Sequence, residues 1–171
     1  MQKNKSSKIQ TAIFHEGRVY QIEISTETRP GIGCHIRGLS DEQSKPILLT
    51  VLTAIQSIGY GIPGGKILIT IDAFDDDWTS DMLHLPVALG LLSLQNDIVL
   101  DTGSFFLSGR LSLDAELKDI KGALEIADFA RRLGRKIFLP KIQYLQNLST
   151  YQEHAVPADN LKEIMNHLDI F

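Results

Sequence analysis

The chain has 171 residues, of which 43% are hydrophobic and 22% are charged, a composition typical of a compact globular protein. This length fits one domain of ordinary size and excludes two full ones. The formal net charge is −4 and the pI is about 5.7, which excludes a protein that binds duplex DNA through a generally basic surface. Nucleic-acid binding would need a local basic patch.

The cysteine content and the N-terminus bear on the cellular compartment. Cys34 is the only cysteine, which excludes an intramolecular disulfide and a cysteine-based zinc site. No apolar run approaches the roughly 18 residues of a membrane span, and the basic N-terminus lacks the apolar stretch of a secretory signal. We predict a cytoplasmic protein with no membrane contact, in which residues 1–9 are a disordered basic tail and residues 10–171 form a single domain.

The first predicted elements are strands. Residues 10–27 contain two runs typical of strands, joined by a tight hairpin turn at Gly17. In the second run, apolar Ile22 and Ile24 alternate with polar residues. A third strand is predicted over Gly33–Arg37, after the helix-breaking pair at positions 30 and 31.

A helix follows these strands, because apolar residues between positions 44 and 58 recur with a period of 3.6 residues. We expect Gly59 to end this helix. Pro46 suits the first turn, where its missing N–H costs nothing, and Ser44 is a candidate N-cap. A strand is then predicted over Lys66–Ile71.

The stretch Leu85–Leu92 is apolar on all sides, which predicts a helix buried on nearly every face, with Pro86 in its first turn. Phe105–Ser108 and Leu111–Leu113 are predicted to form a hairpin that turns at Gly109 and Arg110.

The C-terminal part is predicted to contain two helices and two short strands. Because strands and helices are mixed rather than strictly alternating, the fold class is α/β (α+β), with helices on a sheet that has some antiparallel pairing. The elements are a helix with Leu124, Ile126, Ala127, Ala130 and Leu133 closed by Gly134, a strand Lys136–Leu139, a strand at Ala155 and Val156, and a helix capped by Asp159 that carries Leu161, Ile164, Met165 and Leu168.

The glycine-rich segment 59–66 superficially resembles a Walker A loop. Counting back from Gly65 and Lys66 places Tyr60 where the motif needs its first glycine, and Ile67 occupies the position of the magnesium-binding Ser or Thr. The segment also leads from a helix into a strand, which reverses the order that the motif requires. We expect no nucleotide and no other cofactor here.

Carboxylates are concentrated in the predicted loop 72–81. Clustered oxygens suit Ca²⁺ or Mg²⁺, so a cation site is one interpretation, but the spacing lacks the glycine and closing glutamate of an EF-hand. Solvated loop carboxylates are the commoner explanation, and we predict no metal. The five carboxylates are Asp72, Asp75, Asp76, Asp77 and Asp81.

One dense basic cluster lies at the end of the helix around Ala127 and just after it, and comprises Arg131, Arg132, Arg135, Lys136 and Lys141. Cations at a helix C-terminus gain from the helix dipole, which is a sufficient structural reason for them. The functional interpretation is a patch that contacts phosphate or a partner. In that case Arg131 and Arg135, four residues apart on one helical face, and Lys136 would carry most of the binding.

Three stretches in register resemble a known family. They are Gly33–Asp41 leading into the first helix, Leu85–Leu92, and Gly109–Gly122 with the helix and strand that run to Pro140. In this order they resemble the N-terminal domain of the magnesium-chelatase-like ATPases of the ComM type. That domain is similar to the proteolytic domain of Lon and the C-terminal domain of RadA.

The resemblance implies a fold like the second domain of ribosomal protein S5. It also implies a parent protein in which this domain is fused to an AAA+ ATPase module. The sequence stops at Phe171 without such a module, so we expect a stand-alone domain that acts through a separate ATPase or through copies of itself.

Lon-type enzymes cut peptides with a serine and a neutral lysine that must lie close together. The resemblance places the serine position on Val87 and the lysine position on Leu124, and neither hydrocarbon side chain can transfer a proton. Lon-type catalysis is excluded at these positions, so we lean against an enzyme and predict no catalytic residues.

The sequence also departs from the ComM pattern at three positions. His84 stands where an acidic residue usually precedes Leu-Pro, Arg110 stands where a glutamate follows the glycine, and Pro46 lies where the first helix usually carries basic residues. The role of those polar groups in the fused ATPases is therefore expected to be lost or altered here.

Two hypotheses from different classes remain. The favoured one is a non-catalytic binding or assembly module, either homo-oligomeric or accessory to an AAA+ ATPase in DNA processing. The alternative is a divergent Ser–Lys peptidase that uses other residues. Lys121 lies one helical turn before Leu124, and Ser80 and Ser93 flank the buried helix.

Overall fold

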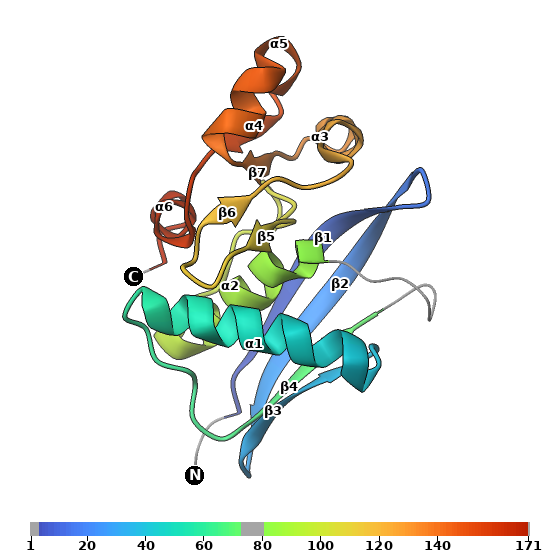
Figure 1. Cartoon of the computed structure of the whole chain (residues 1–171). Helices are drawn as coiled ribbons and strands as arrows, with labels where there is room; N and C mark the ends of the chain where they lie inside the picture. The colour runs from blue at the N-terminus through green and yellow to red at the C-terminus, as the bar shows by residue number, and fades with distance from the viewer. Residues whose placement is uncertain (1–3, 73–80, 171) are drawn as a thin grey trace.

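The computed structural model describes residues 4–72 and 81–170. Its centre is a four-stranded sheet with the strand order β1-β2-β4-β3. Figure 1 shows helix α1 crossing in front of this sheet, helix α2 behind α1, and helices α3, α4 and α5 at the opposite end of the molecule from β3. The mixed α/β class predicted from the sequence is confirmed.

Strands β1 (Ser6–His15) and β2 (Arg18–Arg29) form the predicted antiparallel hairpin. Both residues of its turn have positive φ, 47° at Glu16 and 77° at Gly17, as the tight hairpin turns that match strand twist require. Strand β1 begins earlier than predicted, so residues 6–9 lie in the sheet rather than in a disordered tail. The cause is Ile9, which is buried in the core and pairs with Ile24.

Strands β3 (Gly33–Arg37) and β4 (Lys66–Ile71) have the predicted bounds. Strand β4 is antiparallel to β2 and parallel to β3. Parallel neighbours need a long crossover connection, which α1 supplies.

Helix α1 (Asp41–Ser57) begins three residues before its predicted start. A capping box sets this start, since the Ser40 hydroxyl accepts from the Gln43 backbone N–H while the Gln43 side chain accepts from the Ser40 N–H. Ser44 is therefore not the N-cap, and Pro46 lies in the second turn rather than the first. The helix ends as predicted, before Gly59 at φ 87°.

Helix α2 (His84–Asn96) follows the short 3₁₀ helix η1 (Asp81–Leu83), and its deep burial is confirmed. Each residue from position 84 to 94 is buried. The helix packs against β1, β2 and α1, so it has core on several sides. A Cβ at Gly90 would lie 2.8 Å from the Thr26 Oγ1 of β2, so glycine is required for this close packing.

The prediction of a hairpin that turns at Gly109 and Arg110 is wrong. Strand β5 (Arg110–Leu111) pairs instead with β6 (Leu117–Lys118), so the chain turns over residues 112–116. Gly109 is a close-approach glycine, because a Cβ there would lie 2.9 Å from the Leu85 side chain. Its backbone is bonded to the start of α2, with the Leu85 N–H donating to the Gly109 carbonyl at 2.9 Å.

The segment before Gly109 covers the outer edge of the sheet. The Ser108 hydroxyl is fully buried, accepts from the Ala12 N–H at 3.1 Å and donates to the Ala12 carbonyl. It also lies 2.9 Å from the Thr11 hydroxyl. Because β1 is an edge strand, this contact satisfies backbone groups that no neighbouring strand reaches.

The C-terminal helices and strands largely follow the prediction, and Gly134 closes the helix α3 with φ 67°. Asn160 rather than Asp159 caps the last helix, since its side chain accepts from the Glu163 N–H. Two short helices, α4 and α5, were not predicted. The bounds are α3 Ala123–Arg132, β7 Ile137–Leu139, α4 Lys141–Gln146, α5 Leu148–Tyr151, β8 Ala155–Pro157, parallel to β7, and α6 Leu161–His167.

Within the two described ranges, none of the helices combines the length and the hydrophobicity of a membrane span.

Replacing Leu89 in α2 by alanine should lower the free energy of unfolding by about 2–5 kcal/mol, the usual cost of truncating a buried leucine. Leu89 is fully buried, whereas Leu124 on α3 is 41% exposed and offers a matched control. Leu124→Ala should change stability by no more than about 0.5 kcal/mol. Denaturant unfolding measures both values, and equal small changes would show that α2 is not part of the core.

Candidate functional site

The departures from the ComM pattern meet at one groove. It lies between the start of α1 and the start of α2 and has a volume of about 600 Å³. Leu39, Pro46 and Ile47 form its apolar wall, and Glu42, Gln43, Asp81 and His84 supply its polar groups. We call it the α1–α2 groove. Arg110 reaches it indirectly, through an ion pair of 3.3 Å with Asp81.

The capping box determines which face of α1 lines the groove. Because the helix begins at Asp41, residues 42, 43, 46 and 47 lie on one face over its first two turns. Pro46 has no N–H, so the Glu42 carbonyl cannot receive the usual hydrogen bond from the residue four positions on.

His84 forms the inner end of the groove and is only 8% exposed. Its Nδ1 lies 3.3 Å from both the backbone nitrogen and the carbonyl oxygen of Leu111, so it accepts or donates according to its tautomer. Burial lowers the pKa of His84 below its ordinary value, against the opposing effect of the Asp81 carboxylate. The imidazole is therefore neutral at neutral pH.

The groove has negative electrostatic character. Glu42 and Asp81 contribute carboxylates, Asp41 lies beside them in the first turn of α1, and the neutral His84 adds no positive charge. Arg110 balances only Asp81. The arrangement suits a partner that presents an apolar group next to a cation.

The structure gives no support to Ser–Lys chemistry at the predicted positions. Val87 is fully buried, and Leu124 is 41% exposed on α3. Of the alternative residues, Ser93 is buried and donates its hydroxyl to the Gly90 carbonyl at 2.8 Å, while Lys121 is exposed. Ser80 lies outside the described residues.

The acidic loop falls mostly outside the described residues, and Asp75, Asp76 and Asp77 are among those not described. Over residues 4–72 and 81–170, no three His, Cys, Asp or Glu side chains are grouped as metal ligands.

The basic cluster does not form the open face that was predicted. Helix α3 ends at Arg132, so Arg135 is not on the helix and does not share a helical face with Arg131. Asp128 pairs with Arg131 at 2.9 Å and with Arg132 at 2.6 Å, and the hydrogen bond from Arg131 lowers the pKa of this carboxyl. The charge available to a phosphate is reduced accordingly.

Arg135 is turned towards the sheet. Its guanidinium donates to the Gln10 Oε1 at 2.7 Å and lies 4.5 Å from the centre of the Phe106 ring, a cation–π distance. Lys136 is exposed. The structure therefore brings Arg131 and Arg132 together around Asp128 and places Arg135 in a packing role.

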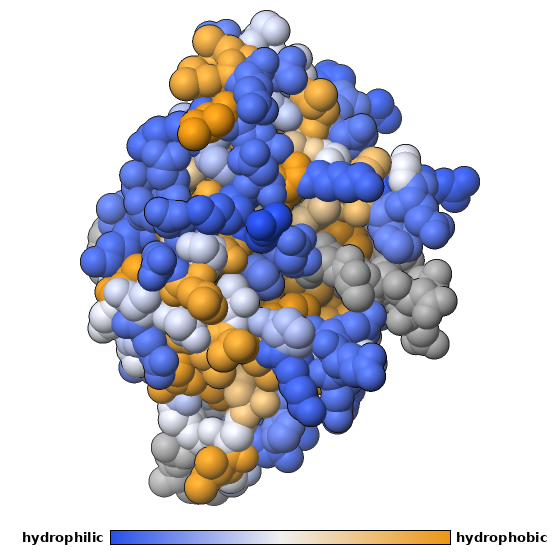
Figure 2. Space-filling view, viewed as in Figure 1, coloured by the Kyte–Doolittle hydropathy of each residue, from blue (hydrophilic) through white to orange (hydrophobic). Residues whose placement is uncertain are grey.

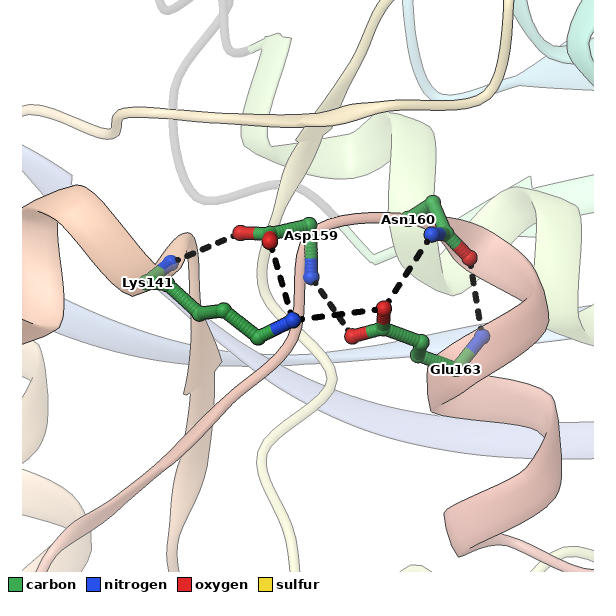
Figure 3. A network of polar contacts seen from close by, with 4 residues as sticks. All are labelled: Lys141, Asp159, Asn160 and Glu163. Carbon is green, nitrogen blue, oxygen red and sulfur yellow. Dashed lines mark hydrogen bonds and ion pairs between the residues drawn. The ribbon is translucent and has the colours of Figure 1, made fainter.

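Lys141 belongs to a separate network that joins α4 to α6 (Figure 3). Its Nζ lies 3.0 Å from the Asp159 carboxylate and 3.4 Å from that of Glu163. Asp159 also accepts from the Lys141 backbone N–H at 3.0 Å. These contacts raise the pKa of Lys141 and lower that of Asp159. Asp159 therefore links the start of α6 to Lys141 of α4, and the prediction that it caps the last helix is wrong.

Apolar side chains are also exposed at the end of the molecule opposite β3. Ile142 is 73% exposed and Leu145 is 65% exposed. Figure 2 shows apolar surface over α4 and α5 at the top of the view. The sequence does not predict this surface, because α4 and α5 are too short to show a helical period.

The fold and the groove define a mixed α/β domain with a hollow between two helices that is suited to binding. Comparison with known proteins then specifies the class. Residues 22–143 match the family model described as the ChlI subunit of Mg-chelatase, and the chain belongs to this family. The family is consistent with the expected fold like that of ribosomal protein S5.

Two curated relatives share the name Uncharacterized protein YifB. The protein from Escherichia coli K12 is 30% identical over 138 residues, and that from Salmonella typhimurium LT2 is 27% identical over 138 residues. Each alignment covers 80% of this chain and 27% of the relative. The resemblance to the ComM-type family predicted from the sequence is confirmed.

Any binding of this domain to nucleic acid should be weak, with a dissociation constant in or above the non-specific range of about 1–100 μM at physiological salt. The reason is that Asp128 already pairs with Arg131 and Arg132. Fluorescence anisotropy with a short single-stranded oligonucleotide at low salt should show further loss in Arg131→Ala/Arg132→Ala and a gain in Asp128→Asn, because these two arginines share Asp128. Tight binding that the double variant retains would contradict a role for this cluster.

Protonation of His84 should couple pH to stability. The folded state holds its imidazole neutral, whereas the unfolded chain protonates it near the ordinary pKa of 6.5. The unfolded state therefore binds more protons, and this contribution to stability is present above that pH and is lost as the pH falls. Denaturant unfolding at pH 7.5 and 5.5 should show a smaller loss for His84→Gln than for the wild type. Identical losses would contradict this role.

Proposed function

We propose that this domain is a non-catalytic binding or assembly module. The observation that carries the proposal is the α1–α2 groove, where an apolar wall lies beside the carboxylates of Glu42 and Asp81. Apolar surface rimmed by charge is typical of an interaction site. The positions expected to hold a Lon-type Ser–Lys pair carry Val87 and Leu124, which cannot transfer protons.

The setting that we propose is work alongside an AAA+ ATPase module in DNA processing. The resemblance to ComM- and RadA-type proteins supports this setting. The chain spans about 27% of the length of the curated relatives it matches. His84, Arg110 and Pro46 differ from the ComM pattern, so we expect the contact surface of this domain to differ from that of the ComM-type proteins.

The domain should neither bind ATP nor hydrolyse peptides. Segment 59–66 connects α1 to β4, in the reverse order to a Walker A loop, and Tyr60 and Ile67 replace residues that the motif needs. Isothermal titration calorimetry with ATP and magnesium should give no heat of binding. Micromolar affinity that Lys66→Ala abolishes would show that the loop does bind nucleotide.

Peptide hydrolysis is the matching test of the non-catalytic assignment. Unfolded casein and fluorogenic peptides should remain intact in the presence of the purified domain. Cleavage that disappears in Ser93→Ala or Lys121→Ala would establish the peptidase alternative and overturn the proposed function.

A further inference from the structure

We propose that copies of this chain associate head to tail, with the turn between β2 and β3 of one copy seated in the α1–α2 groove of the next. The turn comprises residues 30–32, and Ile32 is its projecting side chain. The proposal deepens the proposed assembly function and rests on it. It assigns a partner surface to the groove.

Ile32 is 94% exposed, so it contributes almost nothing to the fold of its own chain. A single exposed apolar side chain is ordinary, and exposure alone carries no conclusion. The turn that presents Ile32 is specifically shaped, however. Gly31 and Gly33 on either side have φ values of 126° and 111°, which only glycine adopts readily. This backbone directs Ile32 outward as a preformed contact, at low entropic cost for binding.

The surroundings of Ile32 carry positive charge. Lys66 packs against Gly31, since a Cβ at Gly31 would lie 3.3 Å from the Lys66 Cβ. Arg29 is the cross-strand partner of Lys66. Arg29 forms an ion pair of 2.5 Å with Glu27, whereas Lys66 forms no ion pair with a carboxylate among the described residues. Two cations and one carboxylate therefore flank the exposed isoleucine.

The α1–α2 groove has the complementary character. Its apolar wall of Leu39, Pro46 and Ile47 offers contact for an aliphatic side chain, and its volume of about 600 Å³ has room for the whole turn. Glu42 on the rim would face Lys66 and Arg29 of the incoming copy, and Asp81, which already pairs with Arg110, would add to the negative charge beside them. Opposite charges at the edge of an apolar contact give an interface its orientation and its selectivity.

Charge also distinguishes Ile32 from other exposed apolar side chains. Val99 is 96% exposed, but it lies between Asp97 and Asp101, which the carboxylates of the groove would repel. Ile142 on α4 is 73% exposed, and its neighbour Lys141 is already held by Asp159 and Glu163. Ile32 combines nearly full exposure with a turn whose neighbouring strand residues, Arg29 and Lys66, are cations.

The two surfaces lie at opposite ends of β3, so one copy can use both at once. Five residues of strand separate them, which is roughly 16 Å at the rise of a strand. In Figure 1 the turn is at the bottom of the view, and α1 begins at the far end of β3. Figure 2 shows apolar surface at the bottom of the same view, over this turn. A contact between different surfaces of identical copies propagates, and forms a ring if its rotation closes or a filament if it does not.

Sedimentation velocity of the wild-type chain, from about 1 to about 300 μM, should show species larger than a dimer that dissociate with added salt. Ile32→Asp and Glu42→Arg should each weaken self-association by at least about tenfold. Val99→Asp removes an equally exposed aliphatic side chain outside the interface and should associate like the wild type. Circular dichroism confirms that each variant is folded.

Mixing provides the decisive measurement. Ile32→Asp retains an intact groove and Glu42→Arg retains an intact turn, so an equimolar mixture should form dimers and nothing larger. A symmetric interface would give no such complementation, and neither would association through α4. The head-to-tail proposal would be overturned if the wild type were monomeric at all concentrations, or if the variants associated like the wild type. Either result would leave intact the proposed binding function, with a different partner in the groove. Peptidase activity would instead overturn the proposed function itself.

Discussion

The burial of α2 is the constraint on which the other elements depend. Gly90 lets this helix approach β2 closely, because any Cβ there would meet the Thr26 hydroxyl at 2.8 Å. That hydroxyl is buried and has no hydrogen-bond partner among the described residues, a cost of about 1–3 kcal/mol. The apolar surface that α2 buries against β1, β2 and α1 outweighs this cost, since a fully buried leucine alone contributes about 1.5–3 kcal/mol.

The position of α2 also determines where the groove forms. The first turn of α2 holds Gly109 through a backbone hydrogen bond and holds Leu111 through His84. Strand β5 is thereby fixed beside η1, which brings Arg110 to Asp81. The capping box of α1 independently turns Glu42 and Pro46 towards the same space. Local interactions at the starts of α1 and α2 therefore position the residues of the α1–α2 groove, which neither helix forms alone.

The sequence predicts the elements that have a strong local period and fails where distant contacts decide. Strands β3 and β4 and helix α2 follow from alternation or continuous burial. The close approach of Gly109 depends on Leu85, which no local pattern reveals, so the sequence predicts a turn there instead. The groove was not predicted as a site. The sequence shows each of the unusual residues that form the groove, but not that they lie together. The Ser40–Gln43 spacing is the local signal that starts α1 at Asp41 and so places Pro46 on the groove face. The position of Arg135 depends on Gln10, 125 residues away, and could not be predicted.

The contact of Ser108 with Ala12 has a consequence for biosynthesis. These residues are 96 positions apart, so the edge of β1 stays uncovered until the ribosome has added the residues that separate them. At about 5–20 residues per second, that interval lasts roughly 5–20 s. During it, the nascent hairpin of β1 and β2 exposes backbone groups to other nascent chains and to chaperones. The Ser108 hydroxyl, rather than a further strand, then binds the Ala12 N–H and carbonyl and ends their exposure.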